Sequence, residues 1–498
     1  MQMQAPMIPL VSVQGRAPAT ILAPILARIR ATIGATILAC GGCSGVCRGP
    51  GCEASWPAAR LSVFEQGPQG SSSATPEAWA PKLGVLADAL ALQEGTAEQG
   101  SSWSVAFLAH RIVIGQPDND RVDQLDLTDD PSEPSATWLD EEGKDRFGAS
   151  VAVSVRGQAF DLWVGAPERE LSRGAVYLFR GVQGGGGRSA AQADLIVEGV
   201  TPADRLGQQI VVCDDLTGDG ASEILISSPW FGHDPELWPF DSVPPDLAGA
   251  VFLLESERVA EATGQVFPWE IGRTWWGGST GEGAGSALAC GREILIGAPW
   301  YREPGSSGSD DPRGRIYRLT PLPDSGPLED VVEPLNGPDG SDWFGSSVAL
   351  LDQRDTKAFA VGCPGYRRGA GRVLLYALDE EGAPITPVTF VQSTDRSDHF
   401  GRTLYAGDLD ADGFDDLIVG NPDYTELPNG YDIGRLWIWL GDNRDTWREG
   451  LPASTADHEI VGQQPFLRIG RGVHVGDHDG DGYDSLLVPT RAPSPAGG

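Results

Sequence analysis

The 498-residue chain is strongly acidic, with a formal net charge of −34 and a pI near 4.4. Because phosphate backbones bind to clustered Lys and Arg, this charge argues against a nucleic-acid-binding protein. Glycine and proline are abundant, at 66 and 38 residues, yet 40% of the residues are apolar, which indicates a turn-rich globular protein and not a disordered chain.

The first 39 residues have the features of a leader segment for export. Arg28 and Arg30 precede a short apolar run that ends in small residues, which is typical of a bacterial secretion signal and too short to span a bilayer. The sequence ILAC at its end resembles a lipoprotein box, so Cys40 is the predicted lipidation site, and a signal peptide without lipid is the alternative. We therefore expect an exported protein, either a lipoprotein of the cell surface or outer membrane or a secreted one.

A cysteine-containing linker is predicted at residues 40–58, a folded domain at 59–490 and a disordered tail at 491–498. The cysteine spacing in the linker matches no standard zinc site. In an exported chain we expect local disulfides, in a pattern left open, among three linker cysteines: Cys43, Cys47 and Cys52. The later cysteines are interpreted as small buried residues: Cys213, Cys290 and Cys363.

A repeated unit of four short strands runs through the folded domain. Its first half is clearest in RFGASVAVSVRGQAFDLWVGAP (146–167), where an apolar strand, a turn and a second strand precede a proline. Its second half contains a β-branched and aromatic strand such as GAVYLF (174–179), then a fourth run such as ADLIVEG (193–199). Seven such units predict an all-β fold, a seven-bladed β-propeller of four-stranded antiparallel blades.

The ring of blades is predicted to close through strands from the N-terminal end of the domain. The seventh unit ends at LLVP (486–489) and so lacks two outer strands. ARLSVFE (59–65) resembles the third strand of the other units, and ALALQEGTAEQGSSWS (89–104) resembles the region of the fourth. We therefore expect the N-terminal strands to complete the last blade, which removes an open sheet edge.

Acidic loops between the first and second strands of three units have the composition of a calcium site. In GDLDADGFDDLIVGNP (407–422), aspartates alternate, a glycine follows, and Asp416 closes the series. Like charges this close repel unless a cation lies among them, and Ca²⁺ takes six to eight oxygens around a sharp glycine turn. The loop closes after nine residues and continues as a strand, which predicts a hairpin and not an EF-hand. A solvated acidic turn is the alternative.

Each of the three loops is predicted to bind Ca²⁺ through side chains and one backbone carbonyl, in a structural role. The first ligand set is Asp408, Asp410, Asp412, Phe414 (carbonyl) and Asp416. The second is Asp215, Thr217, Asp219, Ala221 (carbonyl) and Glu223. The third is Asp477, Asp479, Asp481, Tyr483 (carbonyl) and Ser485. We expect the third site to be weaker, or closed differently, because its nearest carboxylate, Asp484, comes one position early.

These motifs resemble the FG-GAP repeat of the integrin α-subunit head. Phe147-Gly148 together with Gly165-Ala166-Pro167 matches the name of the repeat, and the acidic loops are similar to the calcium-binding hairpins of that family. The resemblance covers nearly all of the predicted folded domain and implies a calcium-stabilised propeller. Since no leg region or transmembrane helix follows Thr490, the chain resembles an isolated head module, and integrin-style signalling does not carry over.

The face opposite the acidic loops is predicted to bind a ligand. In successive hairpins, the turn between strands one and two lies on one face and the turn between strands two and three on the other. Long aromatic-rich insertions lie between strands two and three, and so on the second face. Aromatic side chains on loops of a rigid scaffold favour recognition. The candidate ligand-binding residues are Trp230, Trp238, Trp275, Trp276, Trp300 and Tyr301. Packing of these side chains against the blades is the alternative.

No catalytic constellation is recognised in the sequence, so we predict a binding protein and not an enzyme. Its expected role is adhesion to a protein or glycan at the cell surface, without nucleic acid, and with membrane contact only through a lipid at Cys40. Two alternatives stay open, because unrelated functions share one fold. They are a secreted propeller hydrolase or lyase acting on polysaccharide, and a structural scaffold of the cell envelope.

Overall fold

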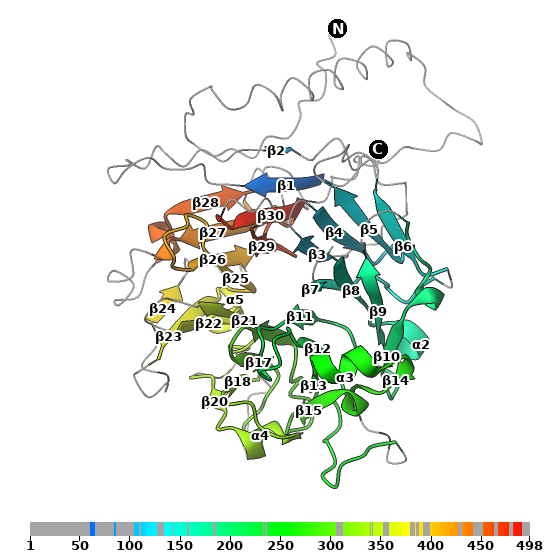
Figure 1. Cartoon of the computed structure of the whole chain (residues 1–498). Helices are drawn as coiled ribbons and strands as arrows, with labels where there is room; N and C mark the ends of the chain where they lie inside the picture. The colour runs from blue at the N-terminus through cyan, green and yellow to red at the C-terminus, as the bar shows by residue number, and fades with distance from the viewer. Residues whose placement is uncertain are drawn as a thin grey trace, which may run out of the picture.

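Short β-strands make up most of the described chain and form separate sheets (Figure 1). This computed structural model describes residues 60–64, 84–85, 104–108, 111–126, 134–141, 143–156, 159–182, 186–232, 234, 237–304, 312–338, 340, 342–351, 358–378, 384, 388–391, 399–426, 431–441, 452–462, 467–477 and 482–490. The predicted leader, linker and tail, with Cys40 and the other linker cysteines, lie outside these residues.

The first sheets in chain order are built from successive hairpins. One contains β3 (Ser104–Leu108), β4 (Arg111–Gln116), β5 (Arg121–Asp126) and β6 (Ala136–Leu139). The next contains β7 (Ser150–Arg156), β8 (Ala159–Ala166), β9 (Ala175–Val182), β10 (Leu195–Glu198) and β14 (Gly264–Val266). A third contains β11 (Ile210–Val212), β12 (Ile224–Ser228), β13 (Ala250–Leu254), β15 (Gly272–Trp276) and β19 (Gly326–Pro327).

The later sheets follow the same plan. They contain β16 (Ala287–Cys290), β17 (Ile294–Ala298), β18 (Arg315–Leu319) and β20 (Leu335–Asn336); β21 (Ser347–Leu351), β22 (Ala358–Cys363), β23 (Arg372–Ala377) and β24 (Val388–Val391); and β25 (Thr403–Gly407), β26 (Asp416–Asn421), β27 (Arg435–Trp439) and β28 (His458–Val461). Another sheet joins β29 (His474–Gly476) and β30 (Ser485–Thr490) to β1 (Arg60–Phe64) and β2 (Gly84–Val85). Short helices lie in the connections: α2 (Arg169–Ser172), α3 (Ser256–Glu261), α4 (Leu328–Val331) and α5 (Tyr366–Gly369).

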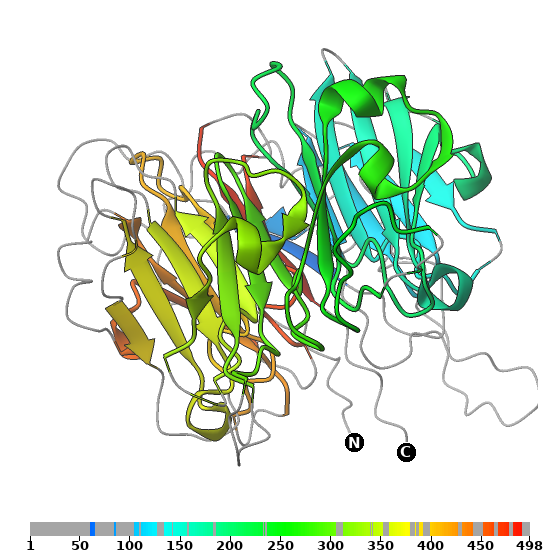
Figure 2. The same ribbon diagram turned by 90° about the horizontal axis from the view of Figure 1, so that it is seen from below.

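The predicted class, an all-β propeller with antiparallel blades, is confirmed. The first strand of each sheet contacts the first strand of the next, in the order β3, β7, β11, β16, β21, β25, β29, and β29 contacts β3. In Figure 2 the cyan and green sheets lie beside the yellow-to-red ones. Two sheets exceed the expected four strands, because β14 and β19 add to their outer edges in parallel orientation.

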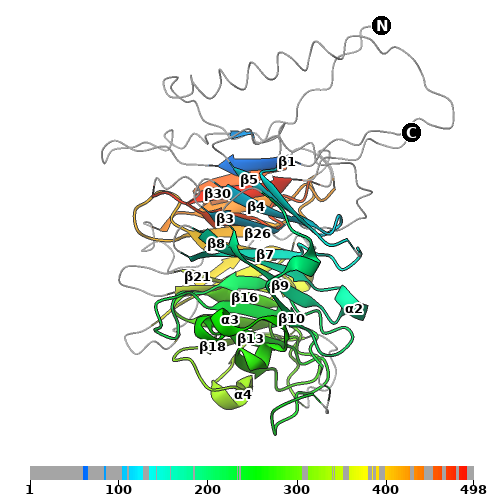
Figure 3. The ribbon, with the colours of Figure 1, turned by 45° about the vertical axis from the view of Figure 1, so that its right-hand side comes forward.

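Strands from the two ends of the described chain share one sheet. β1 pairs antiparallel with β30, from Arg60 opposite Thr490 to Phe64 opposite Leu486, and β2 pairs with the other edge of β1. Figures 1 and 3 show the blue β1 beside the red β30. The third strand is the one expected from 59–65, but the fourth is β2 at Gly84–Val85 and not the expected segment 89–104, whose last residue, Ser104, begins β3 of another sheet. β1 occupies the edge of β30 that would otherwise be free.

The glycines of the repeat mark the points where neighbouring sheets meet. The Ser347 hydroxyl, at the start of β21, donates to the carbonyl oxygen of Gly401, which precedes β25, at 2.7 Å. A Cβ on Gly362 of β22 would overlap the same oxygen. Equivalent side-chain bonds, all to the glycine that precedes the next inner strand, are Ser104 to Gly148, Ser150 to Gly207 and Thr403 to Gly470. The FG glycine and the strand-two glycine are therefore two halves of one contact.

Two of the cysteines are not the isolated buried residues that the sequence suggests. Cys213, directly after β11, forms a disulfide with Cys290, the last residue of β16, across 77 positions. The bond connects neighbouring sheets, and its register could not be read from residues so far apart in the chain. Cys363 is buried, as expected, and is not part of a disulfide.

Replacing Gly362 by alanine tests the contact between sheets. The added methyl group would be forced against the Gly401 carbonyl, and overpacking of this kind lowers the free energy of unfolding by about 3 kcal/mol. Gly340→Ala is the matched control, because no atom lies within 4 Å of its Cβ position. Denaturant unfolding measures both variants. Equal stability of the two would contradict the proposed basis of the repeat.

Candidate metal centre and binding face

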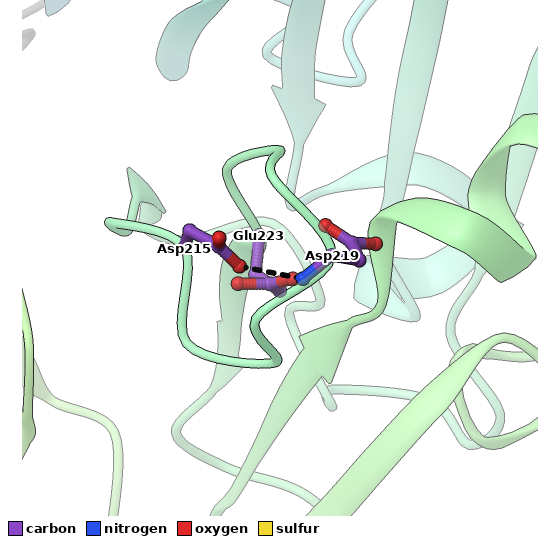
Figure 4. Close-up of side chains that lie close together, drawn as sticks. All are labelled: Asp215, Asp219 and Glu223. Carbon is purple, nitrogen blue, oxygen red and sulfur yellow. Dashed lines mark hydrogen bonds between the residues drawn. The ribbon is translucent and has the colours of Figure 1, made fainter.

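The loop between β11 and β12 gathers three predicted metal ligands (Figure 4). Carboxylate oxygens of Asp215, Asp219 and Glu223 lie within 4.8 Å of one another. Asp215 accepts hydrogen bonds from the backbone N–H groups of Asp219 at 3.0 Å and Gly220 at 2.9 Å. Glu223 is fully buried and accepts the Thr217 hydroxyl at 2.7 Å. Four of the five predicted positions thus belong to one hydrogen-bonded loop that contains the Ala221 carbonyl.

The loop between β25 and β26 contains the other predicted ligand set whose residues are all described. Oxygens of Asp408, Asp410 and Asp412 lie within 4.8 Å of one another. Asp408 accepts from the N–H groups of Asp412 at 3.1 Å and Gly413 at 2.8 Å. Asp416 is fully buried. Phe414, the predicted carbonyl ligand, donates its N–H to Asp412 at 2.8 Å.

The two loops share the same hydrogen bonds at equivalent positions. The first aspartate accepts from the glycine five residues on, and that glycine has a φ of 88° in Gly220 and 87° in Gly413. The closing carboxylate reaches back to the second position, with Glu223 accepting from Leu216 at 2.7 Å and Asp416 from Leu409 at 2.9 Å. Such turns bring one oxygen of each acidic side chain close to the others.

Only part of the third predicted loop can be placed. Asp477 accepts from Gly482 N–H at 3.0 Å, the same bond as in the other loops, while Asp479 and Asp481 lie outside the described residues. Ser485 begins β30 and is buried. Asp484, the early carboxylate, accepts from Asp408 N–H and donates its own N–H to the Asp408 carbonyl, both at 2.9 Å. It therefore links the third loop to the first.

Burial opposes the ionisation of the two carboxyl groups that close the loops, Asp416 and Glu223. Burial is the largest cause that raises the pKa of Asp416 to about 8, and the nearby charges of Asp410 and Asp408 raise it further. Burial likewise raises the pKa of Glu223. Ionising these groups inside the loop is unfavourable until a positive charge arrives. Clustered carboxylate, hydroxyl and carbonyl oxygens suit a hard cation, so the donor sets of both complete loops fit a divalent metal.

The predicted aromatic ligand residues fall into two groups. Trp275 and Trp276 lie in β15 and are buried, because β15 pairs with β13 and packs inside the sheet stack. Tyr301 is also buried, beneath the Arg315 guanidinium, whose centre lies 3.1 Å from the ring centroid. For these three the expected exposure is wrong, and the packing alternative describes them.

The remaining three predicted aromatics are half-buried and do not form a single cluster. Trp238 contacts Trp276 with ring centroids 5.0 Å apart, and Trp300 lies 5.7 Å from Trp343. Trp230 lies directly after β12 and is also half-buried. These side chains stay available to contact a ligand at their exposed edges.

Sequence reasoning missed a repeated arginine–tyrosine stack. Arginines that open third strands lie over tyrosines that follow second strands, and each also meets a carboxylate. The stacks are Arg315 on Tyr301, Arg372 on Tyr366 and Arg435 on Tyr424, and the acidic partners are Glu282, Asp342 and Glu459. The signal was present, because units with Gly-Arg in the third strand also carry Pro-x-Tyr after the second.

Two short patterns that carry chemistry in other proteins lack the necessary context here. GGSTG (277–281) has the spacing of a nucleophile elbow, but it follows β15 and leads into turns and not a helix. His474 and His478 are four residues apart, but His474 lies in β29, where such spacing does not place two side chains on one helix face. His474 packs edge-on against Phe107 at 4.9 Å, and His478 lies outside the described residues.

Comparisons with known proteins agree with this architecture. A family model described as FG-GAP repeat matches residues 400–439. Human Phosphatidylinositol-glycan-specific phospholipase D is 24% identical over 384 residues, covering 65% of this chain and 42% of that protein. Integrin alpha-PS2 of Drosophila melanogaster is 26% identical over 416 residues, covering 73% and 28%, and Integrin alpha-5 of Xenopus laevis is 28% identical over 153 residues, covering 29% and 13%. This chain spans less than half the length of these relatives.

The fold and the repeat together define a β-propeller of FG-GAP type. The chain resembles the integrin α-subunits in particular, as the sequence predicts. Among solved structures, Kuenenia stuttgartiensis Hydrazine Synthase aligns with a TM-score of 0.41 at 10% identity, over 75% of this chain and 90% of that one. In the described part of the chain, no helix has the length and apolar character needed to cross a membrane.

Asp416→Asn tests the charge of the first loop in protein stripped of metal. A carboxyl whose pKa rises from about 4 unfolded to about 8 folded stabilises the fold only while protonated. Stability from this group is therefore complete below about pH 4 and is lost as pH rises toward 8. In EDTA, the unfolding free energy of wild type should fall relative to that of the variant across this range. A constant difference between the two from pH 4 to 8 would contradict the assignment.

Proposed function

We propose that this chain is an exported, calcium-stabilised, seven-bladed propeller that binds a protein or glycan at the cell surface. The observation that carries the proposal is the hydrogen-bond pattern that the loops at 215–223 and 408–416 share. Two loops in different sheets hold the same acidic positions through the same backbone bonds. Such a rigid disc holds its other loops in fixed positions, which lowers the ordering cost of binding a partner.

Calcium is the metal that these loops fit best. Each complete loop offers four side chains and one carbonyl as oxygen donors, and irregular sets of six to eight oxygens suit Ca²⁺ once water is added. Mg²⁺ demands a near-octahedral set at shorter distances. The third loop joins the proposal through Asp477, Asp479, Asp481, Tyr483 and Ser485. The integrin relatives give further support.

Seven blades follow if each sheet counts as one blade. Support comes from the continuous series of contacts between inner strands, which returns from β29 to β3. The last blade then takes its outer strands, β1 and β2, from the N-terminal end of the domain. With this closure the outer edge of β30 is paired, so the last blade has no open edge there.

Export and surface location are supported by the Cys213–Cys290 disulfide. Such bonds persist in oxidising compartments and are rare in the cytosol. The predicted leader and the proposed lipid on Cys40 are consistent with this location. If the chain is held at the surface by lipid, the propeller is presented to the outside as a binding module.

The proposed recognition surface includes the insertion between β12 and β13. Three large apolar side chains there are exposed: Leu237 by 44%, Val243 by 55% and Leu247 by 45%. They lie in the same insertion as Trp238, which packs against Phe240 at 5.0 Å. Exposed apolar side chains in a segment that is also rich in aromatic residues are typical of protein-binding surfaces.

A second candidate function is an enzymatic one, and the observation that favours it is the match to a phospholipase D. The matched part is less than half of that protein, so its activity carries over only as a proposal. Incubation with a glycosylphosphatidylinositol-anchored protein, followed by measurement of released protein, tests it. Release by this chain at a rate proportional to its concentration would replace the binding role with a catalytic one.

Calcium should raise the melting temperature of the purified protein, and EDTA should lower it, because the metal binds only the folded state. Asp412→Ala should reduce this calcium-dependent shift by the part that the 408–416 loop contributes, because it takes away a central ligand there and leaves the 215–223 loop intact. Asp241→Ala, an exposed residue of the insertion, is the control of equal charge change and should keep the full shift. Identical melting of all three proteins with and without calcium would sink the metal assignment.

Binding to the surface of intact cells tests the recognition role. Beads coated with calcium-loaded protein should capture cells of the producing organism. Val243→Asp places a charge in the exposed apolar patch and should reduce capture severalfold without lowering the melting temperature. Val155→Asp, at a side chain that is 70% exposed on β7 and outside the insertion, is the control. Equal capture by wild type and Val243→Asp would exclude the insertion as the binding surface.

A further inference from the structure

Six described turns, each directly before an inner strand, form what we call the collar. In each turn the fourth residue donates its N–H to the carbonyl of the first: Ala149 to Arg146, Gln208 to Arg205, Ser286 to Gly283, Ser346 to Trp343, Arg402 to His399, and Arg471 to Arg468. The start of one inner strand also contacts the turn before the next, as Ser150 contacts Gly207 and Ser347 contacts Gly401. The collar therefore encircles the propeller axis at one end, and the acidic loops lie at the other.

One side of the collar is basic, in a chain whose net charge is −34. First and fourth positions of the turns before β25, β29, β7 and β11 carry this charge: His399, Arg402, Arg468, Arg471, Arg146 and Arg205. Lysine occurs at none of these positions. Guanidinium groups present a planar fork of donors that suits oxyanions better than the single point charge of an ammonium group.

Arginines from three sheets lie near one another at this end. Burial lowers the pKa of Arg471, and the charges of Arg468, Arg402 and Arg146 lower it further. Asp423 is the one carboxylate that opposes this effect. Positive groups held together in this way favour a bound anion, which relieves their mutual repulsion.

The carboxylates that line the collar already have partners. Arg402 pairs with Asp423 at 2.7 Å, Arg468 with Asp432 at 2.7 Å, and Arg146 with Glu168 at 3.8 Å. His399 also lies 3.7 Å from Asp423. Within the described residues, neither Arg471 nor Arg205 forms an ion pair. Two guanidinium groups are thus left for an anion from outside, one half-buried and one exposed.

Aromatic rings continue the collar beside the arginines. Trp300 lies 5.7 Å from Trp343, and Trp343 is stacked on His399 with ring centroids 6.2 Å apart and planes 15° apart. The turn before β16 has Gly283 at its first position, and the Trp300 ring occupies the space that a side chain there would fill. All three rings are half-buried. The row therefore offers ring edges and faces next to the positive charges.

We propose that the collar binds a sugar that carries a tetrahedral oxyanion group, a sulfate or phosphate ester. The oxyanion lies at Arg471 and Arg402, which come from turns of neighbouring sheets, and the sugar ring packs on the Trp300–Trp343 row. A tetrahedral group presents oxygens in several directions and can accept from guanidinium groups of different sheets at once. A single carboxylate has two oxygens in one plane, and the collar carboxylates each engage their neighbouring arginines in that way. The inference rests on the proposed binding role and specifies its ligand class.

Binding of defined polymers to the calcium-loaded full chain tests the proposal. Titration at 0.15 M salt (about physiological ionic strength) compares dextran sulfate, neutral dextran, inorganic sulfate and polyglutamate. Dextran sulfate should bind, neutral dextran should not, and inorganic sulfate should compete weakly. Failure of dextran sulfate to bind, or equal binding of polyglutamate, would overturn the assignment of an anionic sugar.

Variants separate the collar from general charge. Arg471→Gln and the more exposed Arg402→Gln should each weaken dextran sulfate binding about tenfold, the loss of a charge-assisted hydrogen bond. Arg258→Gln in α3 is outside the collar, is 55% exposed and should stay within about twofold of wild type. Trp343→Ala should weaken the polymer and leave inorganic sulfate unchanged. Equal losses in Arg402→Gln and Arg258→Gln would show non-specific attraction and overturn the site.

The two proposals fail separately. Cell capture that persists in a protein that does not bind dextran sulfate would remove the collar site and leave the binding role. Dextran sulfate binding that depends on Arg402 and Arg471, without any cell capture, would leave the site and remove the surface role. Melting curves of every variant confirm that a loss of binding is measured on folded protein.

Discussion

The fold depends on the close approach of two glycine backbones from neighbouring sheets. The carbonyl oxygen of the glycine before one inner strand occupies the space where the strand-two glycine of the preceding sheet would carry a Cβ. A Ser or Thr hydroxyl from the first strand of that sheet donates to the same oxygen. Because a buried carbonyl without a partner is costly, this contact fixes the spacing and the rotation of neighbouring sheets where a glycine stands in the second strand, at Gly115, Gly165, Gly297, Gly362 and Gly420.

Both ends of the disc follow from that constraint. Each inner strand begins at a turn held by the preceding sheet, so residues of these turns are brought around the axis in chain order. Three residues to seven residues later the strand ends, and in three sheets the chain continues into an acidic loop. The proposed recognition surface at one end and the proposed metal loops at the other are therefore supported by the same short strands.

Local patterns in the sequence predict much of this. The acidic loops were predictable because all five ligand positions lie within nine residues, and the strands because their apolar runs recur. Contacts between distant sheets were not. Trp275 and Trp276 stand next to Gly277 and Gly278, which favours a loop in the sequence, but pairing with β13 buries them. The partner of Cys213 depends on how two inner strands align. The collar was also hidden, since its arginines are spread over more than 300 positions and meet only through the ring.

The shared sheet of β1 and β30 also sets the earliest time at which folding can be completed during synthesis. Arg60 cannot pair until Thr490 has been synthesised. The two residues are 490 − 60 = 430 positions apart, and synthesis at 5–20 residues per second takes roughly 20–90 s to cover this distance. During that time the inner edge of β1 has no partner from its own sheet. With the proposed export before folding, this edge would not be presented to other chains in the cytosol, and the last sheet would form on the far side of the membrane.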